Sequence, residues 1–149
     1  MKQILKQVNI IAQNYYCHFV LFVSLVGTLM SLYYSNVELL EPCVLCWYQR
    51  ILLYPLVVIG LVGALTKDKY AKFYILPLSL AGTFLAGYHY LIQKTDWFEQ
   101  IGTCSANNPC NAIDLEYLGF ITIPFLSFLA FNAISIVTAY AWYQSRRKY

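Results

Sequence analysis

The stretch from Tyr15 to Tyr34, YYCHFVLFVSLVGTLMSLYY, runs for 20 residues without a formal charge. A helix needs roughly 20 apolar residues to cross the hydrocarbon core of a bilayer, which is about 30 Å thick. A cleaved signal peptide instead has an apolar region of about 7–15 residues that ends in small side chains. This stretch is longer and ends in Leu32-Tyr33-Tyr34, so we expect a retained membrane-spanning helix.

Three further stretches have the same apolar character. They lie at residues 47–66, 73–92 and 120–140, and Arg50 is the only formal charge in any of them. Charged residues make up 11% of the 149-residue chain, whereas soluble proteins average about 25%. We therefore predict an all-α fold: residues 1–149 form a single integral membrane domain, a bundle of four transmembrane helices.

The distribution of basic residues predicts the orientation of this bundle. Lys and Arg in short flanking segments mark the cytoplasmic side of a membrane protein. Eight of the ten basic residues lie on the side of the two termini, and six of the seven acids lie in the two opposite connections. We expect cytoplasmic termini, outer loops at residues 35–46 and 93–119, and a multi-pass protein of the bacterial cytoplasmic membrane. The eight basic residues are Lys2, Lys6, Lys67, Lys69, Lys72, Arg146, Arg147 and Lys148.

Cysteines gather in the two outer loops, two in each, and the fifth, Cys17, is expected to be a small buried hydrophobic residue inside the first span. Disulfides persist outside the bacterial inner membrane or within a secretory lumen. No basic stretch is long enough, or sufficiently interleaved with aromatic residues, to indicate nucleic-acid binding. The four loop cysteines, and therefore the candidate reactive residues, are Cys43, Cys46, Cys104 and Cys110.

Three interpretations of these four cysteines can be compared. A zinc site would pair Cys-x-x-Cys with a second close pair, but Cys104 and Cys110 are separated by five residues and neither loop contains a histidine, so no metal is expected. A structural disulfide between Cys43 and Cys46 would close a very small ring, worth about 2 kcal/mol against about 4 for a bond spanning ~60 residues. We therefore favour a redox relay, in which thiolates exchange two disulfides between the loops.

Two residues of the second span favour this redox interpretation. Cys46 lies at the outer N-terminus of the helix, where the helix dipole favours a thiolate. Arg50 follows one turn later on the same face. An arginine at this depth either snorkels to the interface or is paired. Beside a redox pair, Arg50 can also bind the carbonyl oxygen of a lipid-soluble oxidant and stabilise the negative charge that reduction places on it.

His89 and Gln93 lie four residues apart at the outer end of the third span, so they share one face of the helix. Taken alone, His89 is typical of an interhelical hydrogen-bonding residue and Gln93 of a polar helix end. If His89 faces Arg50, the two would line a polar pocket at the membrane surface. The rings of Trp47 and Tyr48 would then supply further contacts to a bound molecule.

Three stretches resemble the DsbB family of disulfide-bond formation proteins, and most of all its shorter Gram-positive branch of BdbC-like thiol-disulfide oxidoreductases. They are PCVLCWYQRILLYP at residues 42–55, GYHYLIQK at residues 87–94 and GFITIPFLSFLAF at residues 119–131. The resemblance implies reoxidation of an extracytoplasmic thioredoxin-like thiol oxidase, similar to DsbA or BdbD, with transfer of the electrons to membrane quinone. The Gram-positive character favours menaquinone over ubiquinone, although no single residue distinguishes them.

The resemblance also implies roles for single residues. Cys104 matches the cysteine attacked by the partner, and Cys110 matches its loop mate, which then exchanges with Cys43. Cys46 matches the cysteine that contacts quinone as a thiolate, and Arg50 matches the quinone-binding arginine. The region of His89 and Gln93 matches the third-helix side of the quinone pocket.

Two departures from the Gram-negative members affect these roles. The second cysteine pair is closer together in this chain, and Gln49 stands where some relatives have an acid. Both departures bear on the order of internal exchange and not on the cysteine identities. Two other functions stay open: a tetraspan scaffold or binding protein with inert external disulfides, and a thiol-based metal carrier.

Overall fold

The computed structural model describes residues 2–39, 41–95, 116–117 and 121–146, with side chains at 15–39, 41–95 and 122–146. Four long helices dominate this part of the chain, and a two-residue antiparallel strand pair precedes the last of them. Glu116 pairs with Thr122 in this small ladder. The elements are α1 (Lys2–Asn36), α2 (Val44–Thr66), α3 (Ala71–Lys94), β1 (Glu116–Tyr117), β2 (Ile121–Thr122) and α4 (Ile123–Arg146).

Each helix contains a segment long and apolar enough to cross a membrane, which confirms the predicted fold class of an all-α four-helix membrane protein. The first three predicted spans lie within α1, α2 and α3, while α4 begins three residues after the predicted start at residue 120. Strand β2 (Ile121–Thr122) lies between that predicted start and the first residue of α4, and the hydropathy pattern does not predict it. The segments are Tyr15–Asn36, Val44–Thr66, Ala71–Lys94 and Ile123–Arg146.

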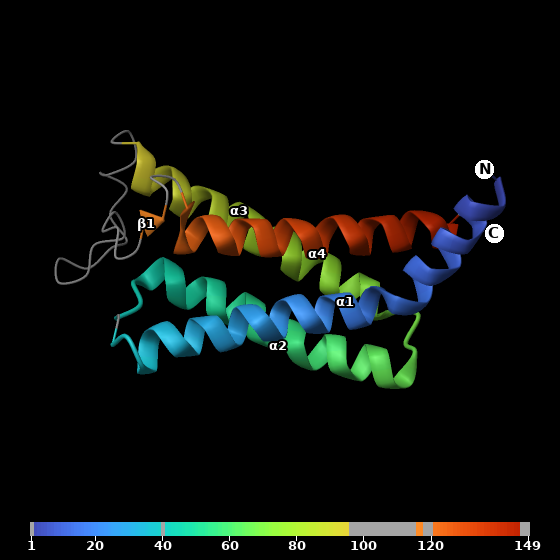
Figure 1. The fold of residues 1–149 in the computed structure, drawn as a ribbon, viewed down its shortest axis with the longest axis horizontal. Helices are drawn as coiled ribbons and strands as arrows, with labels where there is room; N and C mark the ends of the chain where they lie inside the picture. Colours follow the sequence, from blue (N-terminus) through green and yellow to red (C-terminus); the bar gives the residue numbers. More distant parts are fainter. Residues whose placement is uncertain (1, 40, 96–115, 118–120, 147–149) are drawn as a thin grey trace.

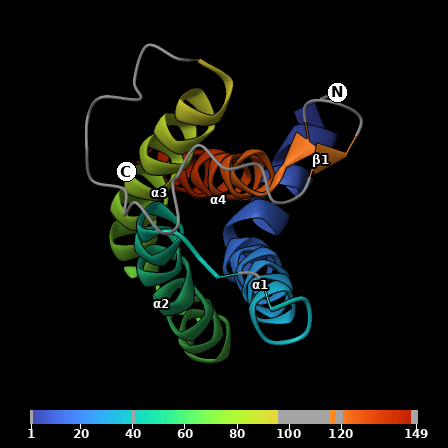
Figure 2. The same ribbon diagram turned by 90° about the vertical axis from the view of Figure 1, so that its left-hand side faces the viewer.

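The helices form one bundle in which α1 packs against α2 and α4, and α3 packs against the same two neighbours. Figure 1 shows the start of α1, the α2–α3 turn and the end of α4 at one end of the bundle. The α1–α2 connection, the end of α3 and the start of α4 lie at the other end. Figure 2, which looks onto that second end, shows the four helices arranged around a common centre.

The α2–α3 turn is fixed by local hydrogen bonds. Lys67 ends α2 in the left-handed conformation, with a φ of 52°. The Asp68 carboxylate then accepts a hydrogen bond of 2.8 Å from the backbone N–H of Tyr70. The Tyr16 hydroxyl of α1 donates to the Asp68 carbonyl at 3.1 Å, which ties the first helix to this turn.

Small residues let the helices approach closely, as is typical of membrane bundles. Gly82 of α3 lies directly against the fully buried ring of Phe131 of α4, and a Cβ at position 82 would overlap that ring. Gly60 of α2 similarly lies against the backbone of Leu21. The α3–α4 contact also contains a buried hydrogen bond of 2.9 Å from Ser135 to Ser79.

The Gly82 contact predicts the cost of a single added methyl group. Gly82→Ala should destabilise the protein by about 1–3 kcal/mol, because the buried Phe131 ring cannot move aside without disturbing the core. Gly87→Ala on the same helix is the matched control, since its Cβ would meet Phe128 at 3.3 Å. Thermal unfolding in detergent measures both. A melting temperature for Gly82→Ala equal to that of Gly87→Ala would contradict this packing.

Candidate functional site

The cysteine pair lies at the N-terminus of α2. Cys43 is the N-cap residue, with extended backbone (φ −67°, ψ 170°), and its carbonyl accepts the first helical hydrogen bond from Trp47 at 3.1 Å. Cys46 lies one turn later. The two thiols are free, with their sulfurs 3.3 Å apart in a hydrogen bond. The N-cap geometry therefore brings both sulfurs together at the positive end of the helix dipole.

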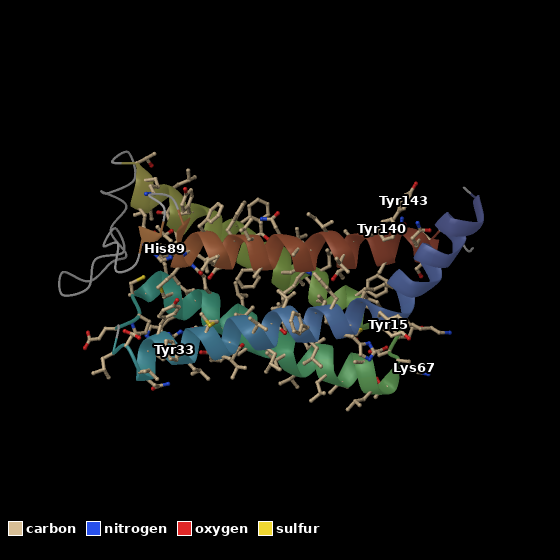
Figure 3. The ribbon with its side chains drawn as sticks, viewed as in Figure 1. Tyr15, Tyr33, Lys67, His89, Tyr140 and Tyr143 are labelled. Atoms are coloured by element: carbon tan, nitrogen blue, oxygen red, sulfur yellow. The ribbon has the colours of Figure 1, made fainter. Side chains whose placement is uncertain are left out.

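A histidine from the third helix contacts this pair. His89 of α3 is 1% exposed, and its Nε2 lies 3.6 Å from the Cys43 sulfur. Its Nδ1 lies 2.9 Å from the amide nitrogen of Gln49, which is itself buried in α2. Figure 3 shows His89 at the loop end of the bundle, far from Lys67 and Tyr140. Gln49, His89 and Cys43 thus form a continuous polar chain between two helices.

The environment favours the thiolate at Cys43. The pKa of its thiol is lowered, first by the hydrogen bond with the Cys46 thiol and then by His89, against the opposing effect of burial. Sequence reasoning expected the thiolate at Cys46, from the helix dipole and Arg50. In the structure the Cys46 thiol and His89 both contact the Cys43 sulfur, which favours the thiolate at Cys43 instead.

Arg50 is anchored to α1 rather than to α3. Its Nη2 donates to the Ser31 carbonyl at 3.1 Å and to the hydroxyl of Ser35. The guanidinium also lies over the Trp47 ring, 5.4 Å from its centroid. Among the described residues, both hydrogen bonds of Arg50 use the same nitrogen, so the donors on Nε and Nη1 can bind another group.

Cys46 and Arg50 both line a cavity of about 360 Å³ between α1, α2 and α4. This volume lies within the range of sites for small organic ligands, about 300–1,000 Å³. Polar groups meet the cavity at its loop end, and apolar side chains form most of the remaining wall. These apolar residues include Phe22, Val26, Met30, Leu53, Leu126 and Phe131.

The structure separates residues that sequence reasoning grouped together. His89 and Gln93 do not line the cavity that Cys46 and Arg50 share. His89 contacts Gln49 and Cys43 instead of facing Arg50. The Trp47 and Tyr48 side chains are both about half exposed, and neither lines the cavity wall. Cys104 and Cys110 lie outside the described residues.

Sequence reasoning overlooked two parts of the site. Gln49 was noted only as a departure from an acid, yet it supplies the hydrogen bond that holds His89. Gln49 also lines the cavity beside Arg50, so its side chain lies between the cavity and His89. The sequence gives no indication that side chains of α1 and α4 line the cavity, because they are of the same apolar types as lipid-facing residues.

His89 also bears on the argument against zinc. The sulfurs of Cys43 and Cys46 and a ring nitrogen of His89 all lie within 4.8 Å of one another, close enough to share a metal ion. The absence of a histidine from both outer loops is therefore no obstacle, because α3 supplies one. The expectation that no metal binds now rests on the wide spacing of Cys104 and Cys110 and stays a prediction.

The lowered pKa of Cys43 predicts how the reduced pair reacts with iodoacetamide. In protein with Cys104 and Cys110 replaced by serine, Cys43 should still be alkylated at low pH. An ordinary thiol, with a pKa near 8.5, is protonated and unreactive under those conditions. Cys46→Ala removes the hydrogen bond that lowers the pKa of Cys43 most, so alkylation of Cys43 in this variant should require a higher pH. Mass spectrometry after timed quenching measures the rates. An unchanged profile in Cys46→Ala would contradict the assignment.

Comparisons with known proteins give the family of this chain. A family model described as disulfide bond formation protein DsbB matches residues 13–141. The chain is 48% identical over 116 residues to "SPbeta prophage-derived disulfide bond formation protein B" of Bacillus subtilis, covering 76% of each chain. It is 45% identical over 114 residues to "Disulfide bond formation protein C" of the same organism, covering 76% of this chain and 83% of the relative. No solved structure matches. The chain therefore belongs to the DsbB family of disulfide bond formation proteins and is a multi-pass bacterial membrane protein.

Proposed function

We propose that this chain is a quinone-dependent oxidoreductase that reoxidises an extracytoplasmic thioredoxin-like thiol oxidase. Membership of the DsbB family supports disulfide formation as the overall activity. One observation supports the quinone in particular: Cys46 and Arg50 lie on the wall of the same largely apolar cavity. A redox-active sulfur and a cation are thus presented together to a hydrophobic ligand.

The residues of the cavity fit a quinone. When bound, a quinone supplies an acceptor for two electrons and two protons. Arg50 is held by Ser31 and Ser35 and keeps donors on Nε and Nη1 that could bind a carbonyl oxygen. Those donors would also stabilise negative charge on that oxygen, and such preorganised donors are effective where water is excluded. Phe22, Met30 and Leu126 provide apolar surface for the ring and its tail.

The four cysteines would carry electrons in a fixed order. The partner's reduced cysteine attacks the Cys104–Cys110 disulfide at Cys104 and forms a mixed disulfide. The partner's second cysteine then attacks this mixed disulfide. The partner leaves in its oxidised form, and Cys104 and Cys110 are both reduced. Cys110 then attacks Cys43 and Cys46 leaves as a thiolate beside Arg50. Cys104 finally attacks Cys110, which restores the second-loop disulfide and leaves Cys43 and Cys46 reduced for oxidation by quinone.

This order requires the loop end of the bundle to face the outside of the cell. The basic residues at the opposite end support that orientation. Gram-positive relatives, such as the two from Bacillus subtilis, support menaquinone over ubiquinone as the acceptor.

Two other functions are separated from this proposal by simple measurements. A tetraspan scaffold with inert external disulfides would retain its function in Cys46→Ser and would bind no quinone. A metal carrier, for which Cys43, Cys46 and His89 provide donors, would contain stoichiometric metal after purification.

Arg50→Ala tests the quinone site. We expect kcat/KM for quinone to fall roughly 10- to 100-fold, because hydrogen bonds from a charged donor to the reduced oxygen are lost. Reaction with the reduced partner in a single turnover without quinone should keep its rate. Anaerobic mixing of the purified protein with reduced thioredoxin-like partner and a soluble menaquinone analogue, followed by absorbance, measures both.

Lys72→Ala is the matched control for Arg50→Ala, since Lys72 bonds to Ser145 at the far end of the bundle. Normal quinone dependence in Arg50→Ala would falsify the role proposed for this side chain.

Cys110→Ser tests the order of exchange. In this variant Cys104 is a free thiol that attacks the disulfide of the oxidised partner, and no Cys110 is present to release it, so a mixed disulfide between the partner and Cys104 should accumulate. Cys104→Ser should form no such complex. Non-reducing electrophoresis and peptide mapping identify the linkage, and a complex attached to Cys43 would reverse the proposed order.

A further inference from the structure

The buried contact between Gln49, His89 and Cys43 extends away from the cavity that Cys46 and Arg50 share: Gln49 reaches the cavity wall, but His89 and Cys43 do not line it. Gln49 and His89 are 6% and 1% exposed, so each side chain gives up water to make this contact. A buried polar group without a partner is costly, particularly in a bundle surrounded by lipid. The pairing of these two residues therefore fixes the position of the imidazole ring.

The direction of the hydrogen bonds determines which ring nitrogen carries the proton. The amide nitrogen of Gln49 lies 2.9 Å from Nδ1 of His89, and an amide N–H can only donate. Nδ1 is then the acceptor, so a neutral ring carries its proton on Nε2. That proton lies on the side of the Cys43 sulfur, 3.6 Å away.

We propose that His89 is a catalytic hydrogen-bond donor to Cys43 and that Gln49 is the positioning residue that directs Nε2–H toward this sulfur. The inference rests on the proposed relay and gives His89 a role different from the quinone contact that the family resemblance implies. It also gives Gln49 a role where the sequence offered only a departure from an acid.

The donor acts when Cys43 is released from Cys110. The Cys104 thiolate attacks the Cys110 sulfur, the Cys104–Cys110 bond forms and the Cys110–Cys43 bond breaks. The electron pair of the broken bond goes to the Cys43 sulfur, and no net oxidation occurs. A leaving thiolate departs faster when it is stabilised. The Nε2–H of His89 supplies that stabilisation without placing a formal charge in the apolar interior.

The first test reads the tautomer directly. The chain contains only two histidines, His18 and His89, so ¹⁵N-labelled histidine gives a simple spectrum of the full-length reduced protein in detergent micelles. We expect His89 to be neutral with its proton on Nε2. Gln49→Leu should give a mixture of tautomers at His89 while leaving His18 unchanged. A wild-type His89 protonated on Nδ1 alone would overturn the proposal, even if the leucine variant does not fold.

The second test measures the reactivity of Cys43. In the Cys104→Ser/Cys110→Ser background, iodoacetamide should alkylate Cys43 about tenfold more slowly when Gln49→Leu or His89→Leu is added, since a hydrogen bond to a charged sulfur is lost. Equal rates in Gln49→Leu and wild type would overturn the proposal.

Ser79→Ala is the control for general destabilisation, because it removes a buried α3 hydrogen bond away from Cys43. If it slows alkylation as much as Gln49→Leu does, the effect is structural and the proposal fails. Neither measurement uses quinone or a protein partner. Loss of quinone reduction with the expected tautomer and alkylation rates would therefore count against the proposed function and not against this inference.

Discussion

Lipid offers no hydrogen-bond partner, so a buried polar side chain in this bundle must be satisfied by another part of the protein. The contact of Gln49 with His89 meets this requirement between α2 and α3. Arg50 meets it by bonding to the backbone and a hydroxyl of α1. Both interactions start from adjacent residues of one helical turn, just after the cysteine pair. The position of α2 relative to its two neighbours, and hence the geometry of both sulfurs, depends on them.

These two interactions give the cysteines different surroundings. Cys43 lies against α3, where His89 is its polar neighbour. Cys46 lies on the wall of the cavity that α1 and α4 complete. A Cys-x-x-Cys pair at a helix N-terminus places its sulfurs close together but does not make them equivalent. Under the proposed relay, one sulfur exchanges with the second loop while the other faces the electron acceptor. The asymmetry comes from the helices on either side and not from the motif.

Much of the fold was predictable because its signal is carried by composition. Apolar stretches such as Tyr15–Tyr34 leave few alternatives to a spanning helix, and the four helices of the structure contain or nearly contain the predicted spans. Cys46 and Arg50 were also predicted to share a face, since four residues make about one helical turn. The contact of His89 with Cys43 joins residues 46 positions apart, and its direction depends on how α3 rotates against α2. Helical periodicity places His89 on a face of its own helix but does not say which neighbour that face meets.

The position of His89 has a consequence for how the second loop reaches the first. α3 ends at Lys94, little more than one turn beyond His89, and the chain then continues directly into the segment that carries Cys104 and Cys110. Cys43 contacts α3 near its end, so of the two sulfurs it is the one beside the helix that leads into that segment. A thiol attached there by a short tether has a high effective concentration at Cys43. Cys46 faces the opposite side, toward the cavity. Under the proposed relay, the helix rotation that brings His89 to Cys43 therefore favours exchange at Cys43, while Cys46 stays on the wall of the cavity.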